Sequence, residues 1–248
     1  MNERPVRHTV KGTGFAIHSQ NPLPKNSPLV RELESLRAEL QTTLKLPRQR
    51  DSVSVYLFPG QEAYRRYMGS TWPNLPPRRA YFVGTSRELA VYSYQSSRVQ
   101  EDLRHEFTHG LLHASLNTVP LWLDEGLAEY FEVKSEHSQR PHQLHLQMLQ
   151  KCRAEGWAPN LETLEQLTDF RKMTLRDYAE SWGWVHYMLQ SDTRAQQVLI
   201  SYLHDLQNKS TAPLLQPKLR QAAPGCDTGM LSHITDLSKT VSVVKYEK

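Results

Sequence analysis

Apolar residues recur at helical spacing in two segments of the first half of the chain. In Leu29–Leu46 leucines stand three or four residues apart, and Pro47 ends the pattern. In Ser97–Ser115 the same spacing is kept by residues such as Leu103 and Phe107. Side chains three or four positions apart share one face of a helix, so both segments are predicted to be amphipathic helices.

Short apolar runs between turn residues predict a small mixed sheet. Pro59-Gly60 breaks one run and Gly84-Thr85-Ser86 joins two others, as is typical of buried strands. A short helix over Gln61–Met68 is predicted after the Pro59-Gly60 break. The predicted strands are Phe15–Ser19, Val53–Phe58, Ala80–Val83 and Leu89–Tyr94.

From Pro120 onward the pattern is almost entirely helical. Pro120 suits the first turn of a helix with a strongly apolar side. A polar stretch from Lys134 to Pro141 separates this helix from the helical remainder, and the tail beyond Pro224-Gly225 is only weakly patterned. The further predicted helices are His142–Glu155, Leu161–Leu167, Leu175–Leu189, Ala195–Gln207 and Leu214–Ala222.

These patterns together predict an α+β fold. We expect an α/β lobe over residues 1–133, in which two helices pack on the small mixed sheet, and a helical lobe over 134–224. The remaining residues, 225–248, are expected to form a partly disordered tail. A chain of 248 residues is long enough to bury a substantial core.

Composition and charge exclude several classes of protein. The net charge of +4 is mild and the basic residues are scattered, so a nucleic-acid partner is not expected. No stretch approaches the roughly 18 apolar residues of a membrane span, and the opening residues contain no apolar segment of a secretory signal. The two cysteines, Cys152 and Cys226, exclude a disulfide framework but leave one bridge open. The oligomeric state is left open.

The segment His105-Glu106-x-x-His109 carries the strongest chemical signal. Two histidines four residues apart lie on one face of a helix, from which both imidazoles can reach the same zinc ion. Glu106, next to the first histidine, is placed to accept a proton from a water molecule at that ion. The motif therefore predicts metal-assisted hydrolysis.

A catalytic zinc site needs a third protein ligand, and the next predicted helix supplies candidates. Glu125 and Glu129 lie four residues apart on one face of that helix, among apolar neighbours. A carboxylate in such surroundings is costly unless it is paired or bound to a metal. We assign Glu125 as the third ligand and Glu129 as a carboxylate that orients a ligand histidine through its other ring nitrogen.

Other histidines give weaker signals. The metzincin pattern requires a glycine and a third histidine at fixed positions after His109, and Gly110 and His113 are both out of place. His113 could face the site, although a local hydrogen bond or a surface position is expected. His137, His142 and His145 follow the helix of Glu125 without convincing ligand spacing, so no second metal site is predicted.

With these motifs the chain resembles the gluzincin, peptidase MA-like, superfamily of zinc metallopeptidases. It is most similar to an uncharacterised family, a domain of unknown function, with an Arg-His-Glu-x-Thr-His stretch and a Pro-x-Trp-Leu-x-Glu-Gly-Leu-Ala-Glu-Tyr stretch. Here these are Arg104–His109 and Pro120–Tyr130, followed by a Tyr-x-x-Ser-Trp-like helix at Tyr178–Trp182. The similarity is expected to cover residues 10 to 190. It implies one zinc ion, with His105, His109 and Glu125 as ligands and Glu106 as general base.

The resemblance also implies further roles. Gluzincins use a tyrosine or histidine of the helical lobe to stabilise the oxyanion, and Tyr178 is the best match, with a core aromatic as the alternative. An edge strand before the motif helix binds extended peptide in gluzincins, which implies this role for Leu89, Ala90 and Val91; a purely structural strand is the alternative. Members are often exported, so export would require a leader absent from this sequence, and the compartment is left open.

The sequence thus predicts a zinc-dependent metallopeptidase with a peptide or protein substrate. Two alternatives stay open: a non-catalytic binding module stabilised by zinc, and a zinc hydrolase acting on a non-peptide amide. A complete motif favours an enzyme, because a zinc site that serves stability usually closes its fourth position with protein.

Overall fold

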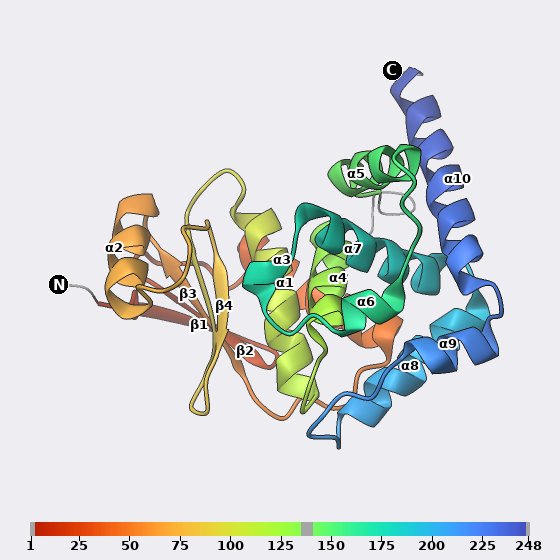
Figure 1. Cartoon of the computed structure of the whole chain (residues 1–248). Coiled ribbons are helices and arrows are strands. Elements are labelled where there is room, and N and C mark those ends of the chain that lie inside the picture. The colour runs from red at the N-terminus through yellow and green to blue at the C-terminus, as the bar shows by residue number, and fades with distance from the viewer. Residues whose placement is uncertain (1–2, 135–140, 247–248) are drawn as a thin grey trace. The chain divides into compact units, whose positions relative to one another are not determined.

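The computed structural model describes residues 3–134 and 141–246 of the chain. The chain divides into two compact units, a first unit of residues Met1–Ser115 and a second unit of residues Leu116–Lys248. Over the described residues there are ten α-helices and one five-stranded sheet (Figure 1). The predicted α+β class is confirmed.

The first unit is built around an open, mixed sheet. Its strands, in chain order, are β1 (His8–Gly12), β2 (Phe15–Ser19), β3 (Val53–Phe58), β4 (Tyr81–Gly84) and β5 (Leu89–Tyr94). They lie in the order β1-β2-β3-β5-β4. β3 pairs in parallel with both β2 and β5, while the pairs β1–β2 and β5–β4 are antiparallel. The outer strands of the sheet are therefore β1 and β4.

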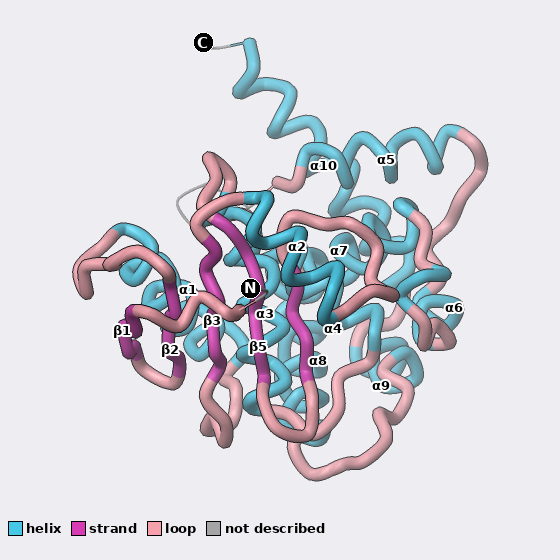
Figure 2. Tube along the Cα trace, turned by 90° about the vertical axis from the view of Figure 1, so that its left-hand side faces the viewer, coloured by secondary structure: helices cyan, strands magenta, loops and turns pink. Residues whose placement is uncertain are grey.

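Different helices cover the two faces of this sheet, α2 (Gln61–Thr71) and α3 (Val99–Ser115). Alternate residues of a strand point to opposite faces. On one face Val53 of β3 lies against α3 at Gly110, where an added Cβ would come within 2.8 Å of a Val53 methyl carbon. On the other face Tyr56 belongs to an aromatic cluster that α2 completes. Figure 1 shows the sheet nearly edge-on between α2 and α3, and Figure 2 shows α2 crossing in front of the strands.

The helix α1 (Pro28–Leu44) packs against α3. It begins after Ser27, whose Oγ accepts a backbone N–H of the first turn. It ends because Lys45 adopts the left-handed conformation, with φ 49°, which no continuing helix allows. The helix is therefore slightly shorter than the predicted Leu29–Leu46, and Lys45 rather than Pro47 ends it.

The other predictions for the first unit differ little from the structure. β2, β3 and β5 have the predicted bounds, β4 is slightly displaced, and α2 continues beyond Met68 to Thr71. β1 was not predicted. Its residues are alternately half-buried and exposed, so its apolar pattern is weak.

The described residues of the second unit contain helices and no strand. The helices are α4 (Leu121–Glu132), α5 (Gln143–Ala154), α6 (Leu161–Glu165), α7 (Leu175–Gln190), α8 (Thr193–Leu206), α9 (Gln216–Ala222) and α10 (Cys226–Tyr246). α7 contacts α4, α5, α8 and α10. Its approach to α4 is close at Gly126, where an added Cβ would lie 2.6 Å from the backbone oxygen of Ser181.

The boundary between the units falls before α4 and not near residue 134. We expected α4 to belong with the sheet, in the lobe over residues 1–133. Instead α4 belongs to the second unit, where it packs closely along α7. The amphipathic pattern of α4 indicates a buried face but does not identify the element that covers it.

The C-terminal segment is helical, which corrects the expectation for residues 225–248. α10 runs through Tyr246, and Met230, Ile234 and Leu237 are buried. Residues 247 and 248 lie outside the described part of the chain. Neither α10 nor any other described helix has the length and apolar character needed to cross a membrane.

Both cysteines belong to the second unit and both are free, buried thiols. Cys152 lies on α5 and Cys226 begins α10. Burial raises the pKa of the Cys226 thiol. The bridge that the sequence left open is therefore not formed.

Candidate metal centre

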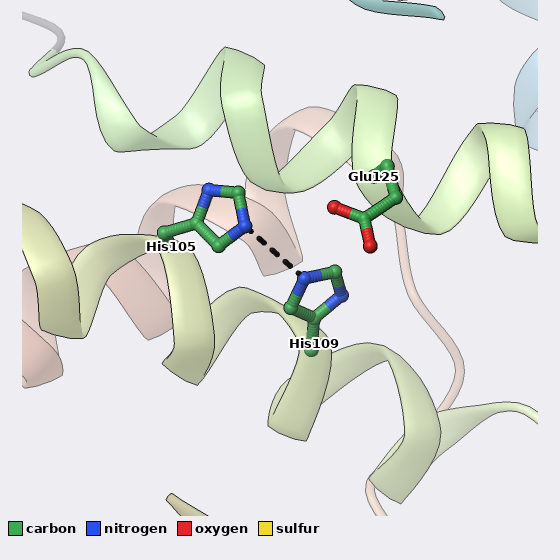
Figure 3. Close-up of side chains that lie close together, drawn as sticks. All are labelled: His105, His109 and Glu125. Carbon is green, nitrogen blue, oxygen red and sulfur yellow. Dashed lines mark hydrogen bonds between the residues drawn. The ribbon is translucent and has the colours of Figure 1, made fainter. Parts of the chain in front are cut away.

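The two histidines of the motif lie one turn apart on the same face of α3 (Figure 3). His109 is buried and His105 is half-buried. Their Nε2 atoms are 3.3 Å apart. Two nitrogens bound tetrahedrally to one zinc ion, at about 2.0–2.1 Å each, lie about 3.3 Å from each other. The donor atoms and their spacing therefore fit zinc.

Glu106 is held against the outer strand of the sheet. Its Oε2 accepts the backbone N–H of Phe82 in β4 at 2.6 Å, and the side chain is only 9% exposed. A carboxylate that accepts a hydrogen bond in a poorly solvated position has a fixed orientation. Burial and the nearby Glu106 carboxylate raise the pKa of Tyr64 on α2. Glu106 thus has a fixed oxygen and a second oxygen that can accept a proton.

Phe82 also contacts the histidine face of α3 through its ring. The ring centroid lies 6.1 Å from that of His109, in a stacked arrangement, and 5.2 Å from that of His113. His113, which the sequence left between the site and a local role, thus lies against Phe82. One residue of β4 therefore orients Glu106 through its backbone and packs on a candidate ligand through its side chain.

Ion pairs fix α3 within the first unit. Arg104, beside the first histidine, is 2% exposed and donates to Glu32 at 2.7 Å and to Glu39 at 3.3 Å, both on α1. Asp102 accepts from Arg79 at 2.6 Å, and this bond raises the pKa of Arg79. Because both pairs reach distant parts of the sequence, the direction of the histidine face is set by the fold of the whole unit.

The strand containing Leu89, Ala90 and Val91 is not an edge strand, which corrects the sequence expectation. These residues belong to β5, which pairs with β3 on one side and with β4 on the other. Both edges of β5 are thus occupied by its neighbours, and no peptide can add to it. The outer strand near the histidines is β4.

The candidate third ligand lies on α4 in the second unit. Glu125 is 7% exposed, among buried residues such as Leu123 and Leu127, and Figure 3 labels it on its helix. Glu129 follows one turn later, and its side chain is 14% exposed. The roles of Glu125 as ligand and of Glu129 as orienting carboxylate stay predictions.

Tyr178, the candidate oxyanion donor, lies in the first turn of α7 and is half-buried. The start of this helix is well defined, because Thr174 and Asp177 form reciprocal capping hydrogen bonds. His186, further along α7, is fully buried, and its Nδ1 lies 2.7 Å from Nε2 of His233. His186 therefore occupies a core position, while the role of Tyr178 stays a prediction.

One group of ligand-type residues was missed at the sequence level. Glu129 lies beside His142 and His145 within the second unit, and these three side chains could hold a metal ion. His137, the third histidine of that stretch, lies outside the described residues. The signal was present as two pairs at helical spacing, Glu129 with Glu132 and His142 with His145.

Comparison with known proteins gives a family of undescribed activity. Residues 102–214 match the model of a family described as "Protein of unknown function (DUF1570)". The match includes both motif stretches and Tyr178, but it begins well after residue 10 and continues past residue 190, unlike the predicted extent. No curated protein matches the chain.

Proposed function

We propose that this protein is a zinc-dependent metallopeptidase. The observation that carries the proposal is the pair of Nε2 atoms of His105 and His109, 3.3 Å apart, on a helix whose Glu106 is bound to strand β4. When bound, zinc supplies Lewis-acid activation of water and of the scissile carbonyl. The resemblance of both motif stretches to gluzincins supports the same chemistry.

The third ligand in this proposal is Glu125. Glu125 is 7% exposed on α4, and coordination to a metal ion is one way in which a carboxylate so far removed from water is stabilised. Two imidazoles and one carboxylate form the ligand set of the resembled enzymes. These three side chains would hold the ion without closing it off from water, as hydrolysis requires.

Glu106 transfers the protons of the reaction. Its orientation is fixed by the Phe82 N–H, so its second oxygen is available to accept the proton of the attacking water. The same carboxyl then gives that proton to the leaving amine, which completes the cycle without a change in the protonation state of the enzyme. Tyr178 donates its hydroxyl hydrogen to the developing oxyanion in this scheme.

The substrate is an extended peptide that pairs with the outer edge of β4. In an antiparallel pair alternate residues direct their backbone groups away from the neighbouring strand. The Phe82 N–H points away from β5, since it reaches Glu106. Gly84 directs its backbone groups outward as Phe82 does; since Glu106 already accepts the Phe82 N–H, a peptide strand added there would pair with the Phe82 carbonyl and with Gly84, and would run past the histidine face of α3.

The test is a Glu106→Gln protein assayed with a mixed peptide pool. The amide keeps the size of the side chain but cannot accept the proton, so we expect unchanged zinc content and a loss of cleavage of about 100-fold or more. The matched control is Glu101→Gln on the same helix, at a partly exposed position paired with Arg98. Equal cleavage by the Glu106→Gln protein, or no cleavage of any peptide by the zinc-loaded natural protein, would overturn the proposal.

A further inference from the structure

We propose that the second unit holds its own divalent transition-metal ion, bound by Glu129 of α4 and by His142 and His145 at the start of α5. The ligand atoms of these three residues all lie within 4.8 Å of one another. The inference uses residues of the second unit only and does not depend on the metallopeptidase proposal; it gives Glu129 the role of a ligand in place of the orienting role that the sequence predicted.

The distances fit a small ion. Oε2 of Glu129 lies 3.0 Å from Nε2 of His145 and 3.4 Å from Nε2 of His142. Ligand atoms at about 2.0–2.1 Å from a tetrahedral zinc ion are separated by about 3.3 Å. The carboxylate oxygen and the two nitrogens therefore surround a point that one ion could occupy with little side-chain movement.

The ligand set is suited to zinc or a similar first-row ion. Imidazole nitrogens with a carboxylate oxygen bind such ions, whereas calcium and magnesium prefer oxygen ligands alone. Glu132, one turn after Glu129, places its Oε1 4.0 Å from Nε2 of His142. A small rotation of Glu132 would supply a fourth protein ligand, which is typical of a zinc site that serves stability.

The surroundings hold the imidazoles in place. The rings of His142 and His145 are stacked with centroids 3.8 Å apart, and their side chains are 14% and 12% exposed. The fully buried Trp182 of α7 packs against both rings, and its ring centroid lies 6.2 Å from that of His142 and 5.7 Å from that of His145. Ligands that are already ordered lose little conformational entropy on binding, and an apolar wall lowers the local dielectric and strengthens the attraction to a cation.

His142 must change tautomer when the ion binds. Nδ1 of His142 accepts the backbone N–H of His145 at 3.4 Å, so a neutral His142 carries its hydrogen on Nε2 and donates it toward Glu129. Coordination through Nε2 requires the other tautomer and breaks this long, weak bond. Metal binding therefore replaces this bond by coordination of both rings in their neutral form.

The structural consequence is a clamp between two helices. Glu129 and Glu132 belong to the last two turns of α4, while His142 and His145 begin α5. An ion bound by both pairs fixes the start of α5 against the end of α4. Its removal is expected to loosen α5 within the second unit and to leave the sheet of the first unit unchanged.

The experiment is a count of zinc per full-length chain after dialysis against zinc and gel filtration. We expect about two equivalents for the natural protein and about one for His142→Ala/His145→Ala. The control is His204→Ala, an exposed histidine of the second unit, which should keep both ions. A His142→Gln/His145→Gln protein, checked for folding by circular dichroism, repeats the test with side chains of similar size.

A second pair of variants separates this proposal from the catalytic one. The His105→Ala/His109→Ala protein should keep one ion, and on cobalt loading its visible spectrum should be lost only when His142 and His145 are also removed. If the natural protein bound a single ion that His142→Ala/His145→Ala retained, the second site would be ruled out. If that single ion were retained by His105→Ala/His109→Ala instead, the second site would stand and the metallopeptidase proposal would fail.

Discussion

At the scale of single residues, Arg104 shows how much of the motif helix depends on groups that never touch a metal. Its side chain is 3% exposed, and its guanidinium pairs with the carboxylates of Glu32 and Glu39, whose side chains are 14% exposed. Removing one partner of a buried ion network leaves uncompensated charge. We expect Arg104→Gln to lower the free energy of unfolding by about 3 kcal/mol, measured by urea denaturation.

The matched comparison for Arg104 is Arg98, which precedes the same helix. Arg98 pairs with Glu101, but its side chain is 54% exposed and that of Glu101 is 37% exposed. Water screens such a pair, so Arg98→Gln should change the free energy of unfolding by less than about 1 kcal/mol. An equal loss in the free energy of unfolding for Arg104→Gln and Arg98→Gln would show that the burial of an ion pair does not determine how much its removal destabilises the protein.

His233 gives a residue-scale prediction about pH. Burial lowers its pKa below the ordinary 6.5, and its Nε2 lies 2.7 Å from Nδ1 of buried His186, so charging both rings would set two N–H groups against each other. Above about pH 6.5 the His233 ring is neutral in both the folded and the unfolded chain, and its full contribution to the free energy of unfolding is present. As the pH falls below about 6.5 the unfolded chain takes up the proton first, so stability is lost.

The measurement is the melting temperature at about pH 7.5 and about pH 5.5. We expect the natural protein to lose a few degrees more than His233→Gln, which keeps a hydrogen-bonding side chain without the titration. His204→Gln, at an exposed position of α8, serves as the control and should behave as the natural protein does. A pH dependence that is the same in all three proteins would show that His233 is not responsible.

Which site residues could be predicted from the sequence depends on how local their geometry is. His105 and His109 share a helical turn, so their spacing alone brings the two Nε2 atoms close together. Glu106 was predicted as a base, but its bond to the Phe82 N–H joins residues 24 positions apart and has no sequence signal. The pair His142 and His145 was noticed but not connected with Glu129, because that proximity depends on how α5 packs.

At the scale of elements, Gly126 determines how closely α4 approaches α7. A Cβ there would lie 2.6 Å from the backbone oxygen of Ser181. A backbone atom can move away only if the helix that contains it shifts, which costs packing energy. Alanine favours a helix over glycine by about 1 kcal/mol, but overpacking costs about 1–3 kcal/mol. We expect the clash to dominate, so that Gly126→Ala lowers the free energy of unfolding by about 1–2 kcal/mol in denaturant titration.

Gly69 in α2 is the matched control for Gly126. It too lies within a helix, but an added Cβ would meet no atom within 4 Å. The gain in helix propensity is then unopposed, and Gly69→Ala should stabilise the protein by about 0.5–1 kcal/mol. Stabilisation by both substitutions would show that α4 can withdraw from α7 without cost.

The elements themselves were predicted better than their arrangement. Bounds of β2, β3 and β5 followed from short apolar runs, because burial of such a strand is visible in its own residues. The position of β5 inside the sheet could not be predicted in the same way, since strand order depends on pairings between distant segments. α10 was missed because its apolar residues, such as Met230 and Ile234, are interrupted by polar ones.

At the scale of the whole molecule, the division of the chain assigns the candidate ligands to different units. His105 and His109 belong to the first unit, and Glu125 belongs to the second. The sequence pattern suggested one lobe over residues 1–133 because both motif helices follow the sheet directly. Instead α4 packs on α7 and belongs to the second unit. A hydrophobic pattern shows that a helix has a buried face, but it does not identify the element that covers this face.

If Glu125 binds the same zinc ion as the two histidines, zinc must affect the stability of both units. We predict that zinc added to metal-free His142→Ala/His145→Ala protein slows amide hydrogen exchange in α3 and in α4 alike, since binding to the native state alone stabilises whatever holds the ligands. Those two substitutions remove the proposed second ion, so protection of α4 reports on Glu125.

In the same background, Glu125→Gln should weaken zinc binding by more than about 100-fold, because loss of a ligand costs more than loss of a group that only orients one. At zinc concentrations that still fill the site, protection should remain in α3 and disappear from α4. Asp124→Asn, at the preceding position of α4, is the control and should keep both effects. Protection of α4 that survives Glu125→Gln would mean that zinc reaches the second unit through another residue, and Glu125 would then no longer be the third ligand.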